Sequence, residues 1–185
     1  MGNHHVLIRA KDSVLVVIDV QERLVPAMQA PARTLHNTKL LLKAARINKV
    51  PAILTEQYPK GLGHTVAEVK KAAGDSIIVP KMHFSCLEDA NVAEPFRSLG
   101  AKQAILVGME AHICVVQTAA GLVEEGYEVF VVSDATASRT IESEKACLER
   151  LSAAGVSIVT TEMVVFEWLG QAGTAAFKEL LPYIK

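Results

Sequence analysis

One cysteine stands where the chain can give a thiol unusual reactivity. Cys114 follows an apolar run over residues 105–108 and a turn of five residues, and it opens an Ala- and Val-rich helical pattern. Free backbone N–H groups and the helix dipole favour an anion at the first turn of a helix. Such a position lowers the pKa of a thiol and makes it a nucleophile. Most free cysteines are instead small packing residues, and this stretch alone does not separate the two interpretations.

Two charged residues complete a chemically coherent set. Asp19 ends an apolar run over residues 13–19, and Lys81 directly follows another over residues 76–80. A carboxylate can accept the thiol proton, while an ammonium lowers the pKa of the thiol and keeps the acid ionised. The thiolate can then attack a carbonyl carbon. Taken alone, such an aspartate often caps a turn and such a lysine is usually solvated, so the joint position of the three residues matters.

Short apolar runs alternate with longer amphipathic stretches along the chain. This alternation predicts an α/β fold, a parallel sheet with helices on both faces. Strands are expected over residues 13–19, 51–55, 76–80, 103–107, 128–133 and 156–160. Helices are expected over residues 32–49, 64–73, 89–99, 113–125, 141–154 and 175–181. Because no repeat, low-complexity tract or linker is present, we expect residues 1–185 to form a single domain.

The three candidates all fall at carboxyl ends of predicted strands, where open parallel sheets bind their ligands. If the strand order is 3-2-1-4-5-6, strands one and four are neighbours, and Asp19 and Cys114 face each other across the crevice. Strand three then lies roughly 10 Å from strand one. The loop that carries Lys81 must therefore fold back toward the crevice.

The composition argues against several classes of function. Half of the 185 residues are hydrophobic, which disfavours disorder, and the net charge of −1 gives no electrostatic basis for binding nucleic acid or an anionic membrane. No run is long enough to cross a bilayer, and the first nine residues lack the features of a signal or transit peptide. Three cysteines without metal-ligand spacing indicate reduced thiols. We therefore expect a cytoplasmic protein.

Three motifs resemble those of the isochorismatase-like cysteine hydrolase superfamily and occur in its order: VIDVQ at 17–21, PKMHFS at 80–85 and GMEAHICV at 108–115. The resemblance extends over residues 14–160. Residues 55–63, TEQYPKGLG, further resemble the subgroup of isochorismatase domain-containing proteins. This resemblance implies a single-domain, three-layer sandwich with a six-stranded parallel sheet of order 3-2-1-4-5-6.

The resemblance also implies a catalytic triad. Cys114 would be the nucleophile, Asp19 the general base and later acid, and Lys81 the electrostatic partner. The family places a cis peptide bond ahead of the cysteine, which here is Met109–Glu110, and the Glu110 and Cys114 N–H groups would form an oxyanion hole. The implied activity is hydrolysis of a small amide-like or related substrate, at a C–N or similar bond, through a covalent thioester.

The chain departs from the nicotinamidases of this superfamily, which carry an Asp-x-His metal site between strands two and three. Residues 56–64 lack that spacing, and Glu56 with His64 is more typical of the region before a helix. We therefore expect no metal, no other cofactor and no nicotinamidase activity.

Four residues flank the triad motifs and are candidate substrate contacts: Gln21, His83, Phe84 and His112. Each has a structural alternative; Gln21, for example, can bond the neighbouring loop instead. The other two cysteines, Cys86 and Cys147, are interpreted as packing residues.

Other functions stay open at this point. An isochorismatase-fold protein can act without catalysis in protein interaction, and an activated, exposed cysteine also suits a thiol redox response. Dinucleotide binding is disfavoured because no Gly-x-Gly-x-x-Gly follows the first strand. The apolar content, together with the resemblance, leads us to expect a homo-oligomer that acts on a small molecule and binds neither nucleic acid nor membrane.

Overall fold

The sheet has six strands, all parallel, in the order β3-β2-β1-β4-β5-β6. A computed structural model describes residues 7–184 of the chain. The strands are β1 (Ser13–Ile18), β2 (Ala52–Gln57), β3 (Ile77–Lys81), β4 (Gln103–Met109), β5 (Glu128–Ala137) and β6 (Ser157–Val159). The predicted fold class and strand order are therefore confirmed. The prediction ended β2, β4 and β5 too early, at residues 55, 107 and 133.

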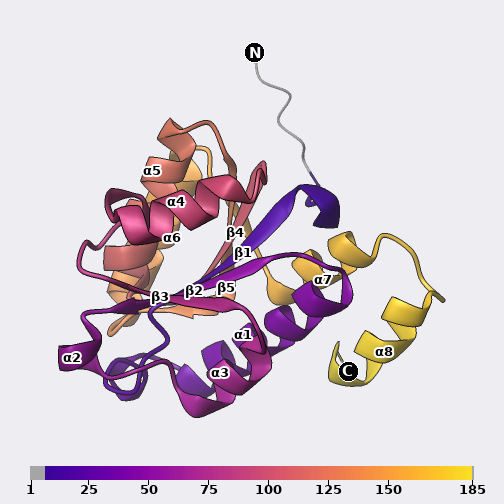
Figure 1. The fold of residues 1–185 in the computed structure, drawn as a ribbon, viewed down its shortest axis with the longest axis horizontal. Coiled ribbons are helices and arrows are strands. Elements are labelled where there is room, and N and C mark those ends of the chain that lie inside the picture. The colour runs from indigo at the N-terminus through magenta and orange to yellow at the C-terminus, as the bar shows by residue number, and fades with distance from the viewer. Residues whose placement is uncertain (1–6, 185) are drawn as a thin grey trace.

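Helices cover both faces of the sheet (Figure 1). They are α1 (Pro31–Ile47), α2 (Pro59–Leu62), α3 (Ala67–Ala73), α4 (Ala90–Ser98), α5 (Val116–Glu124), α6 (Ile141–Ala153), α7 (Thr161–Leu169) and α8 (Ala175–Ile184). Helices α4, α5 and α6 contribute to one hydrophobic cluster, and α1, α3, α7 and α8 contribute to the other. Short 3₁₀ turns at Ala10–Asp12, Val25–Ala27 and Cys86–Glu88 and a π-helical turn at Ala111–Val115 complete the description.

The central strand β1 shows why a continuous apolar run predicted a strand buried on both sides. All six of its residues are buried. Val14, Val16 and Ile18 belong to the cluster under α4–α6, whereas Leu15 and Val17 belong to the cluster under α1. This alternation follows from the two-residue period of a strand.

Helix α7 lies in a stretch where the sequence predicted no element. The Thr160 hydroxyl accepts from the Met163 N–H at its start, and Gly170 ends it with a φ of 62°. Six apolar or aromatic positions among its nine residues leave no clear polar face, so the helical period is hard to detect.

A glycine brings β1 and β4 together at the edge of the sheet that carries the candidate residues. Gly108 has a φ of 130°, and a Cβ there would lie 2.0 Å from the Ile18 carbonyl oxygen. Only glycine fits so close an approach. The chain after β1 and the turn after β4 are consequently neighbours.

Among residues 7–184, none of the helices has the length and apolar character needed to span a membrane. The expectation for the N-terminus rests on residues 1–9, of which 1–6 lie outside the described residues.

Candidate active site

Three strand ends bring the predicted triad into one place. Asp19 follows β1 with a left-handed φ of 54°, Lys81 is the last residue of β3, and Cys114 lies in the π-helical turn after β4. Their exposed fractions are 0%, 1% and 3%, so the whole group is withdrawn from solvent. An acid and an amine at such depth must compensate each other.

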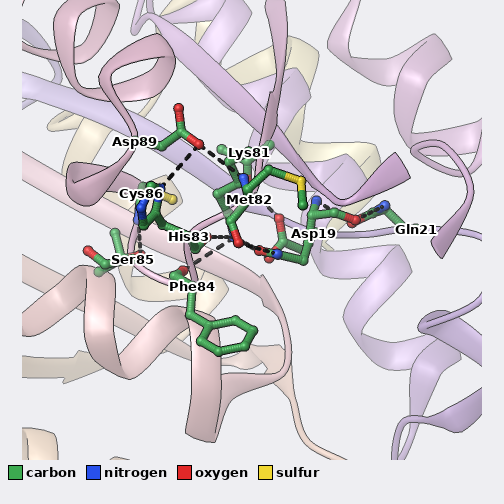
Figure 2. Close-up of polar contacts among 12 residues, drawn as sticks. Asp19, Gln21, Lys81, Met82, His83, Phe84, Ser85, Cys86 and Asp89 are labelled. Atoms are coloured by element: carbon green, nitrogen blue, oxygen red, sulfur yellow. Dashed lines mark hydrogen bonds and ion pairs between the residues drawn. The ribbon is translucent and has the colours of Figure 1, made fainter. Parts of the chain in front are cut away.

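The lysine reaches the aspartate with its own side chain. Lys81 Nζ lies 2.9 Å from Asp19 Oδ2, and both side chains are fully buried. The sequence prediction required the loop after β3 to fold back, but Lys81 still belongs to the strand and its extended stem spans the intervening strand β2. Figure 2 shows the ammonium between Asp19 and the loop that follows β3. The predicted loop movement is therefore wrong, although the predicted meeting of the two charges is right.

Three more acceptors hold the ammonium. Lys81 Nζ donates to Gln57 Oε1 at 2.7 Å and to the carbonyl oxygens of His83 and Phe84 at 3.2 and 3.3 Å. With four acceptors around three protons, the amine is held in its charged form.

Two β2 side chains, which the sequence interpretation missed, complete this network. Thr55 Oγ1 donates to Asp19 Oδ1 at 2.7 Å, and Gln57 accepts from Lys81 as described above. The available signal was the spacing of Thr55 and Gln57, because residues i and i+2 of a strand share one face. Both stand at the carboxyl end of the strand that separates β1 from β3.

The pKa of the Cys114 thiol is shifted in the direction opposite to the prediction. Burial raises the pKa of Cys114, the Asp19 charge raises it further, and the Lys81 charge only partly opposes them. For Lys81, burial alone would lower the pKa, but Asp19, then Cys114 and Cys86, outweigh it and the pKa is raised. The predicted lowering of the Cys114 pKa is therefore wrong. The resting site is a neutral thiol beside a compensated ion pair.

The turn before the cysteine also departs from the expectation. Residues 7–184 contain no cis peptide bond, so the predicted cis bond at Met109–Glu110 is wrong. The chain turns instead at Glu110, with a left-handed φ of 56°, a conformation that avoids the cost of a cis bond. The Glu110 carbonyl accepts from the N–H groups of Ile113 and Cys114 at 2.8 and 3.0 Å. One of the two predicted oxyanion-hole donors is therefore already bonded within the turn.

Gln21 holds a loop. Its Nε2 donates to the carbonyl oxygens of Gln57 and Gly63 at 3.0 and 2.7 Å, and its Oε1 accepts from the Gln57 N–H at 2.7 Å. The side chain is fully buried. The structural alternative stated for Gln21 agrees with these contacts, since its donors and its acceptor are all engaged by the backbone.

His83 and Phe84 place their backbone, rather than their side chains, against the triad. Their carbonyl oxygens contact Lys81, whereas the His83 side chain is 61% exposed, 3.6 Å from Asp89, and Phe84 is 53% exposed. In Figure 2 the Phe84 ring points away from the ion pair. The side chains therefore lie at the rim of the site.

A second polar cluster lies beside the turn that carries Cys114. His112 Nδ1 is 2.9 Å from Ser138 Oγ, and its Nε2 is 3.6 Å from Glu110 Oε2. Glu110 Oε1 forms an ion pair with Arg139 Nε at 3.1 Å. Glu110 is 6% exposed, and its Oε2 has no hydrogen-bond partner among the residues described. This cluster ties the turn after β4 to the loop after β5.

The remaining cysteines are both buried, as expected for packing residues. Cys86 belongs to the hydrophobic cluster under α4–α6, and burial raises its pKa to about 11. Cys147 belongs to the same cluster and donates to the Ala111 carbonyl at 3.1 Å.

Glu56 and His64 form a local pair rather than part of a larger ligand set. Glu56 Oε2 is 3.0 Å from His64 Nδ1, and its Oε1 accepts from the Thr65 N–H at 2.7 Å. The pKa of Glu56 is lowered, because these hydrogen bonds together outweigh the opposing effect of burial. Within residues 7–184, no group of three His, Cys, Asp or Glu side chains has an arrangement suited to a metal ion.

Comparison with known proteins assigns the fold to a family. Residues 13–163 match the Isochorismatase domain. The zebrafish isochorismatase domain-containing protein 2 is 40% identical over 92% of this chain and 85% of its own length. The chain belongs to the isochorismatase family. Isochorismatase domain-containing protein 1 of zebrafish is 37% identical over 94% of this chain, and the chain spans 61% of that relative's length.

Two solved structures superpose closely on this chain. The MAR1 ribonuclease of Caenorhabditis elegans superposes with a TM-score of 0.90 at 35% identity, covering 96% of this chain and 92% of that one. YcaC of Escherichia coli, described as an octameric hydrolase of unknown specificity, superposes with a TM-score of 0.91 at 24% identity, over 97% and 91% of the two chains. At these TM-scores both chains share the fold described above over nearly their whole length.

Proposed function

We propose that this chain is a metal-independent cysteine hydrolase of a small amide-like or related substrate. The observation that carries the proposal is the buried ion pair of Asp19 and Lys81 beside Cys114. A carboxylate kept ionised next to a neutral thiol can take the thiol proton at the moment when sulfur attacks. An isolated buried carboxylate would instead take up a proton and lose that capacity.

The reaction begins with proton transfer. Asp19 accepts the Cys114 proton while Sγ forms a bond to the substrate carbonyl carbon, and the π electrons of the carbonyl move to its oxygen. The tetrahedral adduct then collapses, the C–N bond breaks, and Asp19 returns the proton to the leaving amine. Cys114 is left as a thioester.

Hydrolysis of the thioester repeats the sequence with water. Asp19 takes a proton from the attacking water, the second tetrahedral adduct collapses with cleavage of the C–S bond, and the proton returns to sulfur. The acid product leaves, and every group regains its starting protonation state. Throughout both halves Lys81 stays charged, because Asp19, Gln57 and two carbonyl oxygens accept from it.

The depth of the site supports a small substrate. Cys114 is 3% exposed, so a bulky polymer backbone cannot bring its reacting atom to the sulfur without large movement. Together with the net charge of −1, this argues for a small molecule and against nucleic acid or a membrane as the partner. We further propose a cytoplasmic location, because the three cysteines are free thiols, as is usual in a reducing compartment.

We also propose that the chain forms a homo-oligomer through the rim of its active site. Met82 and Phe84, next to Lys81 in sequence, are 64% and 53% exposed. Exposed apolar side chains grouped beside a site mark a contact surface, and the octameric assembly described for YcaC gives a precedent within the fold. Mass measurement in solution tests this, and a monomer at micromolar concentration would contradict it.

Turnover of a panel of small amides by the wild type and by Cys114→Ala tests the proposed reaction. We expect the variant to lose about 10³-fold or more in kcat, as removal of a nucleophile does elsewhere. Cys147→Ala is the matched control, because it removes another buried thiol from the same hydrophobic cluster. Equal turnover by the wild type and Cys114→Ala would reject the mechanism.

A further inference from the structure

Arg139 occupies the same edge of the sheet as the nucleophile. In the pairing of β4 with β5, Met109 lies opposite Ala137. Glu110 comes one residue after the first, and Arg139 comes two residues after the second. The carboxyl ends of β1, β4 and β5, which carry Asp19, Cys114 and Arg139, are adjacent in the sheet. At the usual strand spacing they span about 10 Å, the length of a small molecule.

Two contacts fix Arg139 relative to the turn that carries Cys114. Its Nε forms an ion pair with Glu110 Oε1 at 3.1 Å, and Glu110 is buried and accepts from the Cys114 N–H through its carbonyl. The preceding residue, Ser138, is bonded to His112 within the same turn. These contacts hold Arg139 against the turn that carries Cys114.

The terminal nitrogens of Arg139 remain available. The ion pair uses Nε, the inner nitrogen, and the side chain is 54% exposed. Within residues 7–184, neither Nη1 nor Nη2 takes part in a hydrogen bond, and Nε is the nitrogen that Arg139 brings to Glu110 in the ion pair. A guanidinium held by its inner nitrogen presents the planar pair of outer N–H groups, the geometry that binds a carboxylate through two parallel hydrogen bonds.

Neighbouring cations do not share this availability. Lys81 is 1% exposed and is held by four acceptors. Arg33 directs its Nη2 to Glu144 Oε1 and to the Thr136 carbonyl, at 3.3 and 3.4 Å. Of these three cations, Arg139 is the one near Cys114 whose terminal nitrogens are free to bind a ligand.

We propose that Arg139 is a substrate-binding residue that selects amides bearing a carboxylate. The inference rests on the proposed function, since it places the scissile carbonyl at Cys114 and the carboxylate at the Arg139 fork. Glu110 acts as the positioning residue of Arg139. Because its buried carboxylate pairs with Nε, the two terminal nitrogens of Arg139 stay directed away from Glu110. An alternative in which Arg139 only neutralises Glu110 predicts no preference between charged and neutral substrates.

Calorimetric binding to the Cys114→Ala protein tests the proposal without turnover. The probes are malonamate, succinamate and glutaramate, each compared with its neutral methyl ester. We expect at least one carboxylate to bind about tenfold or more tightly than its ester, as a charge-assisted bidentate contact allows. Adding Arg139→Gln should reduce this preference to within about twofold, and Arg139→Lys should keep the charge but retain only part of it. Adding Arg46→Gln, an exposed arginine of α1, should leave it unchanged.

A second variant covers the chance that Arg139→Gln disturbs the fold by leaving Glu110 buried without its cation. Glu110→Gln combined with Arg139→Gln removes both charges and should lose the preference equally. No carboxylate preference for any of the three pairs, or a preference that persists without Arg139, would overturn the proposal. Cys114-dependent hydrolysis of neutral amides without such a preference would overturn this inference alone. A carboxylate preference without Cys114-dependent turnover would instead overturn the proposed function.

Discussion

Replacing Lys81 by methionine gives a sharp test of the site, because it preserves most of the apolar stem and removes the charge together with the hydrogen bonds of the ammonium. Lys81 Nζ lies 2.9 Å from Asp19 Oδ2 and 2.7 Å from Gln57 Oε1, and neither charged side chain has any exposed surface. Breaking a buried pair by removing one partner costs about 3–5 kcal/mol, because the other charge is left uncompensated. We expect Lys81→Met to lose that amount from a total stability of about 5–15 kcal/mol.

A double variant separates the charge effect from the loss of packing. Asp19→Asn combined with Lys81→Met removes both charges, and its amide oxygen can still accept from the Thr55 hydroxyl. Since replacing a whole buried pair by neutral groups is often close to neutral in stability, the double variant should regain at least half of what Lys81→Met loses. Such a recovery is the signature of a directly coupled pair.

Urea unfolding followed by the fluorescence of Trp168 provides the measurement, because this is the chain's one tryptophan and it is 5% exposed. With a slope of about 2 kcal/mol per molar urea, the expected loss moves the midpoint down by about 1.5–2.5 M. Lys145→Met is the matched control. Its side chain is 72% exposed and lies 3.8 Å from Glu149, so its midpoint should barely move. A Lys81→Met midpoint equal to that of Lys145→Met would refute the buried pair.

Two further predictions follow from the same edge of the sheet. Iodoacetamide labelling of Cys114 should have its pH midpoint above that of an ordinary thiol, since burial and the Asp19 charge raise its pKa. Asp19→Asn should shift that midpoint to lower pH, and a wild-type midpoint below an ordinary thiol's would contradict the electrostatics. Gly108→Ala should cost several kcal/mol in urea unfolding or prevent folding, because its Cβ would lie 2.0 Å from a β1 carbonyl oxygen. Gly126→Ala is the control, because Gly126 also has a positive φ, 86°, but nothing lies within 4 Å of the added Cβ. An equal loss of unfolding free energy in both variants would show that backbone strain, and not the contact with β1, sets the cost.

Local sequence signals were sufficient for most of the fold. A run such as residues 13–19 has no polar face that could contact solvent. It therefore predicts a strand covered on both faces, and β1 is buried on both. Six such runs separated by helical stretches leave few topologies other than a parallel sheet. The failures occurred where the local period is absent: α7, which is apolar nearly all round, and the extension of β5 beyond residue 133 through the polar Asp134 to Ala137.

The candidate site was predictable in its residues but not in its electrostatics. Asp19 and Cys114 follow from strand order, since β1 and β4 are neighbours. The contacts of Thr55 and Gln57 were missed because the predicted second strand ended at residue 55, before Gln57, so the strand face that the two side chains share was not recognised. The direction of the Cys114 pKa shift is also a sum over three-dimensional neighbours. A helix start and a lysine both suggested a lower pKa, whereas burial and the nearby carboxylate reverse it.

That reversal bears on what the thiol is suited to do. A redox-responsive cysteine is exposed and largely ionised, because the thiolate is the form that oxidants attack. Cys114 is 3% exposed, and its neighbours favour the protonated form. The Asp19–Lys81 pair has no net charge, so ionising Cys114 alone would add an uncompensated charge to a buried site, whereas passing its proton to Asp19 would not. In the proposed reaction, the sulfur would therefore become nucleophilic only when a carbonyl carbon is present to receive its electrons. This arrangement favours acyl transfer and disfavours a standing thiolate, and it makes the redox interpretation the weaker account of this cysteine.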